Sequence, residues 1–134
     1  MAVGPDDSVA VAVAGMRDKG AQCALVVEEG VLTGIFTERD FLNRVAAERR
    51  DPTAVRMRDV MTAKPETLRG TDCVSYAINR MAIGRFRNVP IVDRRGGPTS
   101  VLDVRLVMMH LIKVFAELEQ SGPEDPAWID IGGG

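Results

Sequence analysis

Residues 7–16 (DSVAVAVAGM) and residues 72–81 (DCVSYAINRM) decide the fold, because the second stretch repeats the first 65 positions later. The repeat continues outward: Val26-Val27-Glu28 returns as Ile91-Val92-Asp93 at the same spacing. After one inserted residue, residues 34–39 (GIFTER) align with residues 100–105 (SVLDVR). Self-similarity at a fixed period indicates two copies of one supersecondary unit. We therefore expect an α/β fold, with two β-α-β-β-α units related by pseudo-two-fold symmetry and any functional cleft between them.

The first copy has the signals of a helix, two strands and a second helix. Asp6 and Asp7 are the candidate N-caps of a helix that runs to Lys19 and ends at Gly20. Residues 23–27 and 31–36 are short apolar runs around a Glu-Glu-Gly turn, typical of paired strands. Thr37 then opens the second helix. Only residues 1–4 precede the first helix, so the first copy looks clipped and its half of the cleft incomplete.

The second copy starts with residues 65–68, which are long enough for a lead-in strand. Asp72 is the expected cap of the next helix, and residues 89–92 and 99–102 are the matching strands. The last helix, over residues 103–119, is apolar nearly all round, so we expect it to be buried on most sides, partly through association with another chain. The expected divisions are residues 2–50, residues 51–118 (connector and second copy) and a flexible tail, residues 119–134, anchored only by Trp128.

Composition limits the function classes. A chain of 134 residues with a net charge of −2 is one compact domain without the positive field of a general nucleic-acid binder. It shows no signal pattern and no membrane-spanning apolar run, so we expect a cytoplasmic protein with no membrane partner. Cys23 and Cys73 lack zinc-type spacing and are expected to be reduced, buried small hydrophobic residues.

At residues 34–41 (GIFTERDF) the chain resembles the CBS domain, named after cystathionine β-synthase, in which a Gly-x-x-Ser/Thr-x-x-Asp turn opens a helix. Residues 58–62 (RDVMT) resemble the stretch that commonly introduces a CBS copy, and residues 88–93 (NVPIVD) are similar to the family's x-x-Pro-Val-Val-Asp strand. The resemblance covers roughly residues 2–118. It implies a tandem CBS pair, or Bateman module, that senses an adenosine-containing ligand (AMP, ADP, ATP, NAD or S-adenosylmethionine) and forms a homodimer.

Thr37 and Asp40 have two interpretations. They form the pattern of a capping box, in which a hydroxyl and an acid three residues later satisfy the first N–H groups of a helix. The same geometry offers N–H groups and a hydroxyl to a phosphate, and a carboxylate to both ribose hydroxyls. In the family these two positions contact phosphate and ribose, so the resemblance favours a ligand site.

The resemblance also implies that the other copy completes this site. The further binding residues that it implies are Ile35, Arg39, Pro65, Glu66, Thr67, Phe86, Arg87 and Val89. Ile35 and Phe86 would sandwich a purine, and backbone groups near Glu66 would read the adenine edge. Arg39 and Arg87 are the phosphate candidates. The alternatives are plain core packing for Phe86 and a solvated surface role for either arginine.

The second copy departs from the pattern. Asp103 takes the place of Thr37 and Leu106 that of Asp40. Leucine cannot accept a ribose hydroxyl, and an ionised Asp103 would repel phosphate; Asp103 is most simply an N-cap. We therefore expect a degenerate second site and one competent site per chain.

The expected function is a non-enzymatic regulatory module whose adenosyl ligand changes how a separate, unnamed protein is regulated. The sequence shows no nucleophile–base pair and no paired-carboxylate motif, so an enzyme is not expected. His110 has no cysteine, histidine or acid at metal spacing beside it, so no metal is expected. The alternative is a dimerisation scaffold whose pockets have decayed and bind nothing.

Overall fold

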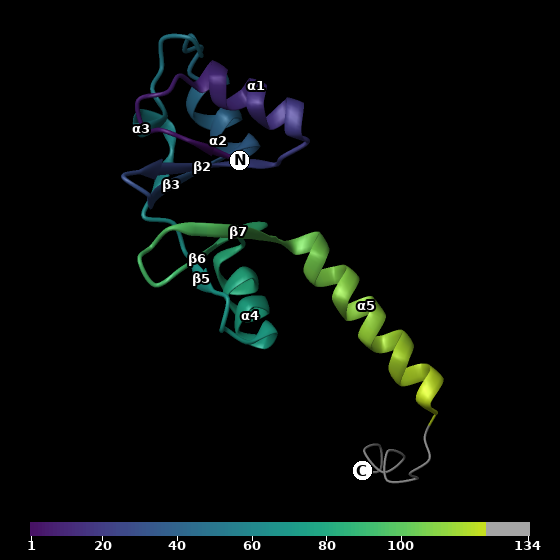
Figure 1. The fold of residues 1–134 in the computed structure, drawn as a ribbon. Coiled ribbons are helices and arrows are strands. Elements are labelled where there is room, and N and C mark those ends of the chain that lie inside the picture. The colour runs from purple at the N-terminus through teal and green to yellow at the C-terminus, as the bar shows by residue number, and fades with distance from the viewer. Residues whose placement is uncertain (123–134) are drawn as a thin grey trace.

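The 65-residue repeat is visible in the elements themselves. Helix α1 (Val9–Lys19) and helix α4 (Val74–Gly84) begin and end 65 positions apart, and so do the β-bulges at Val26/Val27 and Ile91/Val92. The computed structural model describes residues 1–122 of the 134-residue chain. Both copies follow the expected β-α-β-β-α order (Figure 1).

The first copy is built on a four-stranded sheet in the order β1-β2-β3-β4. Strands β1 and β2 are parallel, whereas β2 pairs with β3 and β3 with β4 in antiparallel fashion. Its elements after α1 include a four-residue helix that widens into a π turn. The bounds are β1 (Ala2–Val3), β2 (Cys23–Glu28), β3 (Val31–Thr37), α2 (Glu38–Phe41), the π turn (Leu42–Ala46), α3 (Met57–Val60) and β4 (Thr62–Ala63).

The second copy is built on a three-stranded sheet in the order β5-β6-β7. Strand β5 is parallel to β6, and β6 and β7 form an antiparallel hairpin. The pairing of Val3 with Val26 and of Leu68 with Ile91 is the same contact in the two copies. The bounds are β5 (Leu68–Arg69), β6 (Asn88–Val92), β7 (Pro98–Asp103) and α5 (Val104–Ser121).

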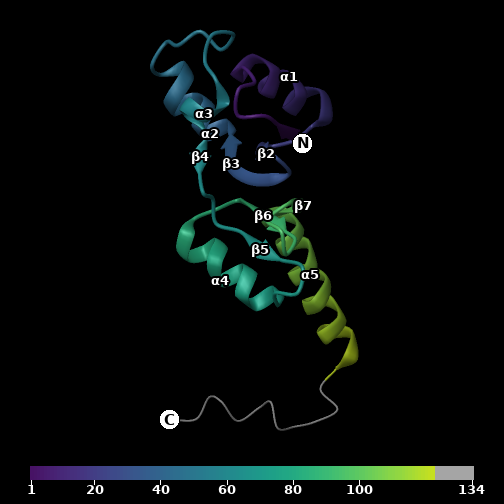
Figure 2. The same cartoon turned by 60° about the vertical axis from the view of Figure 1, so that its left-hand side comes forward.

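The two copies stack with their sheets facing each other and their helices outward (Figures 1 and 2). Cys23, Leu25 and Ile35 of the first sheet are buried together, with Val101 of β7 packed against them. A backbone hydrogen bond of 2.9 Å from Leu32 N to the Gly96 oxygen joins the turns of the two copies. The sheet faces that meet here are therefore held by apolar contact and define the walls of any cleft between the copies.

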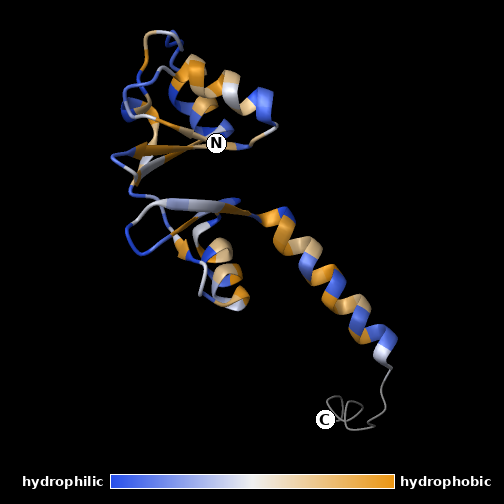
Figure 3. Ribbon diagram, in the orientation of Figure 1, coloured by the Kyte–Doolittle hydropathy of each residue, from blue (hydrophilic) through white to orange (hydrophobic). Residues whose placement is uncertain are grey.

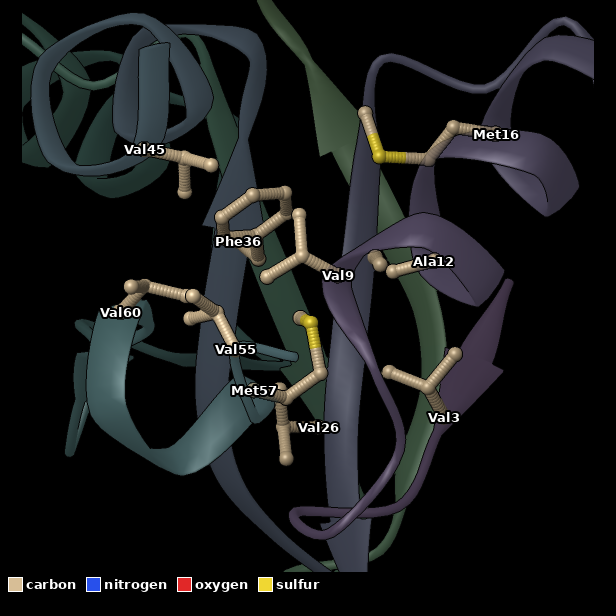
Figure 4. Packing of buried hydrophobic residues seen from close by; sticks show 11 residues of the cluster. Val3, Val9, Ala12, Met16, Val26, Phe36, Val45, Val55, Met57 and Val60 are labelled. Carbon is tan, nitrogen blue, oxygen red and sulfur yellow. The ribbon is translucent and has the colours of Figure 1, made fainter. Parts of the chain in front are cut away.

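The main core lies between the first sheet and its helices (Figure 4). Phe36 and Val9 are fully buried there. Val55, Met57 and Val60, from the connector, are buried in the same cluster. The connector thus returns to cover the first copy before β4 leads to the second.

The predicted N-caps of α1 and α4 are wrong: Asp7 and Asp72 lie one residue before the observed caps, and Asp6 lies two residues before. The N-caps are Ser8, whose hydroxyl accepts from Val11 N at 3.3 Å, and Cys73, which makes no side-chain cap bond. The repeated aspartates close the turn before each helix instead: Asp7 Oδ2 accepts from Gly4 N at 2.7 Å and Asp72 Oδ2 from Arg69 N at 2.8 Å. An aspartate one position before the cap meets the amide behind it rather than those of the first helical turn.

The first copy has a lead-in strand despite its short start. Ala2 and Val3 form β1, which has the same two-residue length as β5 in the second copy. Residues 1–4 suffice because only two residues pair with the neighbouring strand. The lead-in strand is therefore present in both copies.

Two burial predictions fail. Cys23 is buried, and burial raises the pKa of its thiol, but Cys73 is exposed at the start of α4, where Ser75 and the Tyr76 N–H lower its pKa. Helix α5 projects from the body of the chain, and Val107 is its one buried residue (Figures 1 and 3). Val104 and Leu111 also pack against the second copy's core, but most of the other apolar side chains of this helix are exposed in a single chain. Residues 119–121, assigned to the tail, continue α5, and Trp128 lies outside the described residues.

Candidate functional site

A pocket of about 680 Å³ lies between the two copies. It opens where β3 meets α2 in the first copy, beside the chain that follows β4 and the loop between α4 and β6. The residues that line it are Gln22, Ile35, Thr37, Glu38, Arg39, Thr62, Lys64, Pro65, Glu66, Gly84, Arg85, Phe86, Arg87 and Asn88. Both copies and the segment between them contribute to it, as the pseudo-symmetric arrangement predicts.

The structure brings together seven of the ten predicted binding residues in this pocket. These seven are Ile35, Thr37, Arg39, Pro65, Glu66, Phe86 and Arg87. The other three do not line it: Val89 is fully buried in the second copy's core, Thr67 is exposed, and Asp40 lies just behind Thr37. Val89 alternates with Asn88 along β6, so its side chain lies on the opposite face of the strand from the pocket.

Strand pairing explains why the connector reaches this site. Gly34 pairs with Ala63 and Ile35 with Thr62, so β4 runs along the edge of β3 where β3 approaches its end at Thr37. The next residues, Lys64 to Glu66, therefore pass the mouth of α2. A backbone hydrogen bond of 3.1 Å from Lys64 N to the Thr33 oxygen holds this path in place.

The corner formed by Thr37 and Asp40 is a complete capping box. Asp40 N donates to Thr37 Oγ1 at 3.4 Å, and Asp40 Oδ2 accepts from Thr37 N at 2.9 Å and from Thr37 Oγ1 at 3.0 Å. The local interpretation of the motif is thus satisfied in the chain. It leaves the Thr37 hydroxyl at the pocket wall and the Asp40 carboxylate one layer behind it.

A second set of contacts ties this corner to the connector. Asp40 Oδ1 accepts from Thr62 Oγ1 at 3.3 Å and faces Arg44 Nη1 at 3.7 Å. Arg44 in turn donates to the carbonyl oxygens of Val60 and Met61 at 2.9 and 2.8 Å, at the end of α3. The Asp40 side chain is 12% exposed. The carboxylate therefore links α2 to β4, and any ligand that contacts it also acts on the connector.

Glu66 combines an engaged side chain with a free backbone. Its carboxylate forms an ion pair with Arg80 of α4, which raises the pKa of the arginine. Within residues 1–122, the peptide N–H and carbonyl of Glu66 take part in no hydrogen bond. Glu66 thus lines the pocket with a backbone donor and acceptor that no partner within these residues engages.

The position equivalent to Thr37 in the second copy is filled by the protein's own side chains. Asp103 caps α5 through Arg105 N at 2.7 Å, as predicted, and also forms an ion pair with the Arg105 side chain at 2.7 Å. Hydrogen bonds from Arg105 lower the pKa of Asp103, so the carboxylate is ionised at neutral pH. With its amide nitrogen toward Asp103, Gln22 donates to Oδ2 at 3.1 Å and accepts from Arg105 Nη2 at 3.2 Å. Leu106 is more than half exposed.

Sequence reasoning missed seven of the lining residues. They are Gln22, Glu38, Thr62, Lys64, Gly84, Arg85 and Asn88. Most of these seven residues are next in the chain to residues that the motifs identified. They were missed because the motifs do not include their positions. Arg85 had a signal of its own, because it stands 65 positions after Gly20, where the first copy ends its helix with glycine.

Two further properties of the described residues concern metal binding and membrane insertion. Among residues 1–122, no three His, Cys, Asp or Glu side chains gather closely enough to hold a metal ion. In the same part of the chain, no helix has both the length and the apolar character needed to cross a membrane. His110 is exposed on α5.

Comparison with known proteins assigns the family. The CBS domain family model matches residues 1–47. The CBS domain-containing protein CBSCBSPB1 of Arabidopsis thaliana is 35% identical over 76% of this chain and 19% of its own length. The chain spans about a fifth of the length of the first curated relatives that it matches.

Solved structures agree with this assignment. A protein with CBS domains from Burkholderia ambifaria has a TM-score of 0.78 and 28% identity, over 84% of this chain and 82% of the other. The CBS domain protein of Pyrobaculum aerophilum complexed with AMP has a TM-score of 0.73 and 20% identity, over 84% and 91% of the two chains. The second likeness concerns the fold alone. Together with the repeat, these matches show that the chain belongs to the CBS-domain family and carries two copies of that domain in tandem.

Proposed function

We propose that this chain is a non-enzymatic regulatory module that binds one adenosine-containing ligand in the pocket between its CBS copies. The ligand classes are AMP, ADP, ATP, NAD and S-adenosylmethionine. The observation that carries the proposal is the pocket of about 680 Å³, to which both copies contribute apolar, hydroxyl, basic and free backbone groups. Few, convergent polar groups around an apolar slot are typical of a small-molecule site.

The lining divides into the parts that a nucleotide needs. Ile35 and Phe86 offer apolar surface to a purine, and the unpaired backbone of Glu66 offers a donor and an acceptor to its edge. Arg39 and Arg87 supply two guanidinium groups for phosphate. The Thr37 hydroxyl donates to Asp40 Oδ2 in the chain and would have to turn toward the phosphate to donate to it. In the Pyrobaculum aerophilum structure of the same fold the ligand is AMP.

Asp40 is the proposed ribose acceptor, although its carboxylate already has partners. Oδ2 accepts two hydrogen bonds from Thr37, whereas Oδ1 accepts one bond, of 3.3 Å, from Thr62. A carboxylate has about four lone-pair sites. Oδ1 therefore retains the capacity to bind a ribose hydroxyl, at the expense of its long contact with Thr62.

One site per chain follows from the second copy. Asp103 is ionised, paired with Arg105 and reached by Gln22, and Leu106 offers no acceptor. A nucleotide phosphate at that position would meet a carboxylate in place of the Thr37 hydroxyl. We propose that this second site stays empty.

Regulation would come from the contacts that a ligand makes with both copies. Asp40, Thr62 and Arg44 connect the pocket wall to the connector, so a bound ligand favours one relative angle of the two copies. A ligand shifts such an equilibrium only by its differential affinity for the two states. The regulated protein would respond to this relative angle of the two copies.

Isothermal titration calorimetry with AMP, ATP and NAD tests the proposal. We expect one site per chain and a loss of about 1.5–3 kcal/mol, which is roughly a 10- to 150-fold loss of affinity, for Asp40→Ala. Asp18→Ala removes the same charge from an exposed carboxylate on α1 and should bind like the wild type. Asp40→Ala also opens the capping box, so a second comparison isolates the contact with ribose. The wild type should bind 2′-deoxy-ATP more weakly than ATP, whereas Asp40→Ala should bind the two ligands equally. Absence of binding by every nucleotide contradicts the proposal.

A second candidate, a dimerisation scaffold with no ligand, is favoured by one observation. Six apolar side chains of α5 are more than half exposed, namely Leu106, Met108, Met109, Ile112, Phe115 and Leu118. A patch of this kind marks an interaction surface. We propose a homodimer through α5 in either case. The scaffold alone predicts a stable dimer whose melting temperature no nucleotide raises.

A further inference from the structure

The pocket holds more positive charge than one phosphate group requires. Four of its lining residues are basic: Arg39, Lys64, Arg85 and Arg87. They stand in a chain whose net charge is −2. Local concentration of one sign of charge in a concave site raises the affinity for a ligand of the opposite sign.

None of these four cations is neutralised by an ion pair within the described chain. Six other basic residues there do form ion pairs: Arg17, Arg44, Arg58, Arg80, Arg105 and Lys113. The pocket has two carboxylates, and Glu66 is already paired with Arg80. Four cations therefore face one unpaired carboxylate, that of Glu38.

Two of the four cations stand in a backbone conformation that favours glycine. The φ angle is 55° at Arg85 and 47° at Lys64, in the left-handed region where a Cβ is unfavourable. Residues 1–122 contain four non-glycine residues of this kind, the others being Glu29 and Arg49. At the position equivalent to Arg85, the first copy has Gly20, with φ 60°. A strained residue that lines a pocket motivates a functional hypothesis.

The loop that carries Arg85 is packed on itself. The ring of Phe86 lies so close to Gly84 that a Cβ on Gly84 would overlap it. Phe86 and both of its arginine neighbours line the pocket. The loop thus keeps one apolar and two cationic side chains at the same wall, with Lys64 and Arg39 contributed from the other copy's side.

We propose that the pocket selects a ligand with a chain of two or three phosphate groups, so that adenosine di- and triphosphate bind more tightly than the monophosphate. Arg85 and Lys64 are the residues that make this selection, beyond the contacts of Arg39 and Arg87 with the first phosphate. Each further phosphate adds negative charge and acceptor oxygens that arginine and lysine bind through charge-assisted hydrogen bonds. This inference rests on the function proposed above.

Calorimetry with adenosine, AMP, ADP and ATP, in EDTA at one ionic strength, tests it. ATP should bind the wild type at least about ten-fold more tightly than AMP. Arg85→Gly should weaken the binding of ATP by about ten-fold or more and that of AMP by less than about three-fold, because the proposal assigns Arg85 to the further phosphates. Arg49→Gly is the matched control: it removes the same charge from an exposed residue with φ 53° outside the pocket, and should leave every affinity unchanged.

Glycine suits the left-handed backbone, so neither variant should lower the melting temperature. Lys64→Gly is a second variant of the same kind and should reduce the preference for ATP in the same way. Equal affinity for AMP and ATP, or equal weakening of both by Arg85→Gly and Lys64→Gly, overturns the inference while the proposed function stands. Absence of binding by all four compounds overturns both.

Discussion

A single side chain, Asp93, closes the hairpin between β6 and β7. Its Oδ1 atom accepts from Arg95 N at 2.8 Å and from Gly97 N at 2.9 Å. These N–H groups, Gly97 first and Arg95 second, lower the pKa of Asp93 below the ordinary 3.8. Gly96, with φ 83°, supplies the left-handed residue that the turn needs. The turn is therefore held by an ionised carboxylate.

The lowered pKa makes the stability of this turn depend on pH. The folded state binds the Asp93 proton less readily than the unfolded chain, so its contribution is complete above the ordinary pKa and is lost as pH falls through the lowered folded value. Urea unfolding of the wild type and Asp93→Asn should therefore differ at pH 7, and the difference should shrink below about pH 4.

Asp18→Asn is the control for this experiment, since the Asp18 carboxylate is exposed and contacts only its neighbour Arg17. As a substitution on the surface, it should change the free energy of unfolding by less than about 0.5 kcal/mol at pH 7. An NMR titration of the Asp93 carboxyl group checks the shift directly. A pKa at or above 3.8 in the folded protein would contradict the role given to the two N–H groups.

At the scale of elements, the pairing of β4 with β3 depends on a glycine of the CBS motif. Gly34 faces Ala63 across the pair. A Cβ on Gly34 would overlap the side chain of Met61 and lie 3.2 Å from the Thr62 oxygen. Glycine lets the connector strand approach the edge of β3, and the approach places Thr62 and Lys64 in the pocket.

Gly34→Ala should accordingly lower the free energy of unfolding by about 1–3 kcal/mol, the usual range for overpacking. It should also weaken ligand binding, because β4 must move away from the site. Gly70→Ala is the matched control, with nothing within 4 Å of the added Cβ, and should stay within about 0.5 kcal/mol of the wild type in the same denaturation series. Equal stability of both variants would show that β4 adapts without cost.

At the scale of the whole molecule, the outward helix α5 is the main unexplained surface of one chain. Its exposed apolar side chains recur at spacings of three and four, whereas Val107 is buried in the second copy's core and Val104 and Leu111 pack against the same core (Figure 3). Burial of a large aliphatic or aromatic side chain contributes about 1.5–3 kcal/mol. A second copy of the chain that covers this face of α5 would bury several of these side chains, and each burial would contribute a free energy of this size to association.

Ile112→Glu should therefore convert the proposed dimer to a monomer, because Ile112 is 65% exposed in the single chain and would be buried at the interface. Lys113→Glu introduces the same residue at the next position, where the side chain is 75% exposed, and should leave the dimer intact. Analytical ultracentrifugation gives the masses. A monomeric wild type would contradict the proposed dimer.

Several features of the fold could be predicted from local sequence because each depends on local physics. The periodicity of α1 and α4, the glycine stop at Gly20 and the strand runs are signals within single segments. The N-caps were missed because Asp7 and Asp72 each satisfy a preceding amide, which composition cannot distinguish from a cap. Cys73 is exposed because it stands at the N-cap of α4, a position that its residue type does not reveal.

The residues of the candidate site also divide into those that local sequence predicts and those that only the fold brings together. Ile35, Thr37 and Arg39 follow from the motif around them, whereas Lys64 and Arg85 join them only through the pairing of β4 and the packing of the copies. Val89 was misplaced because the strand face it occupies is decided by the second copy's core.

The sequence by itself determined that two copies of one CBS unit stand in tandem and that a hydroxyl and a carboxylate cap the helix at the end of β3. Only the tertiary structure decided that four unpaired cations meet in one pocket and that the second position is filled by Gln22, Asp103 and Arg105. The physical reason is distance along the chain: repeats and caps are made by residues near one another in sequence. The charge of a cleft is summed over segments that meet only when the two sheets pack face to face.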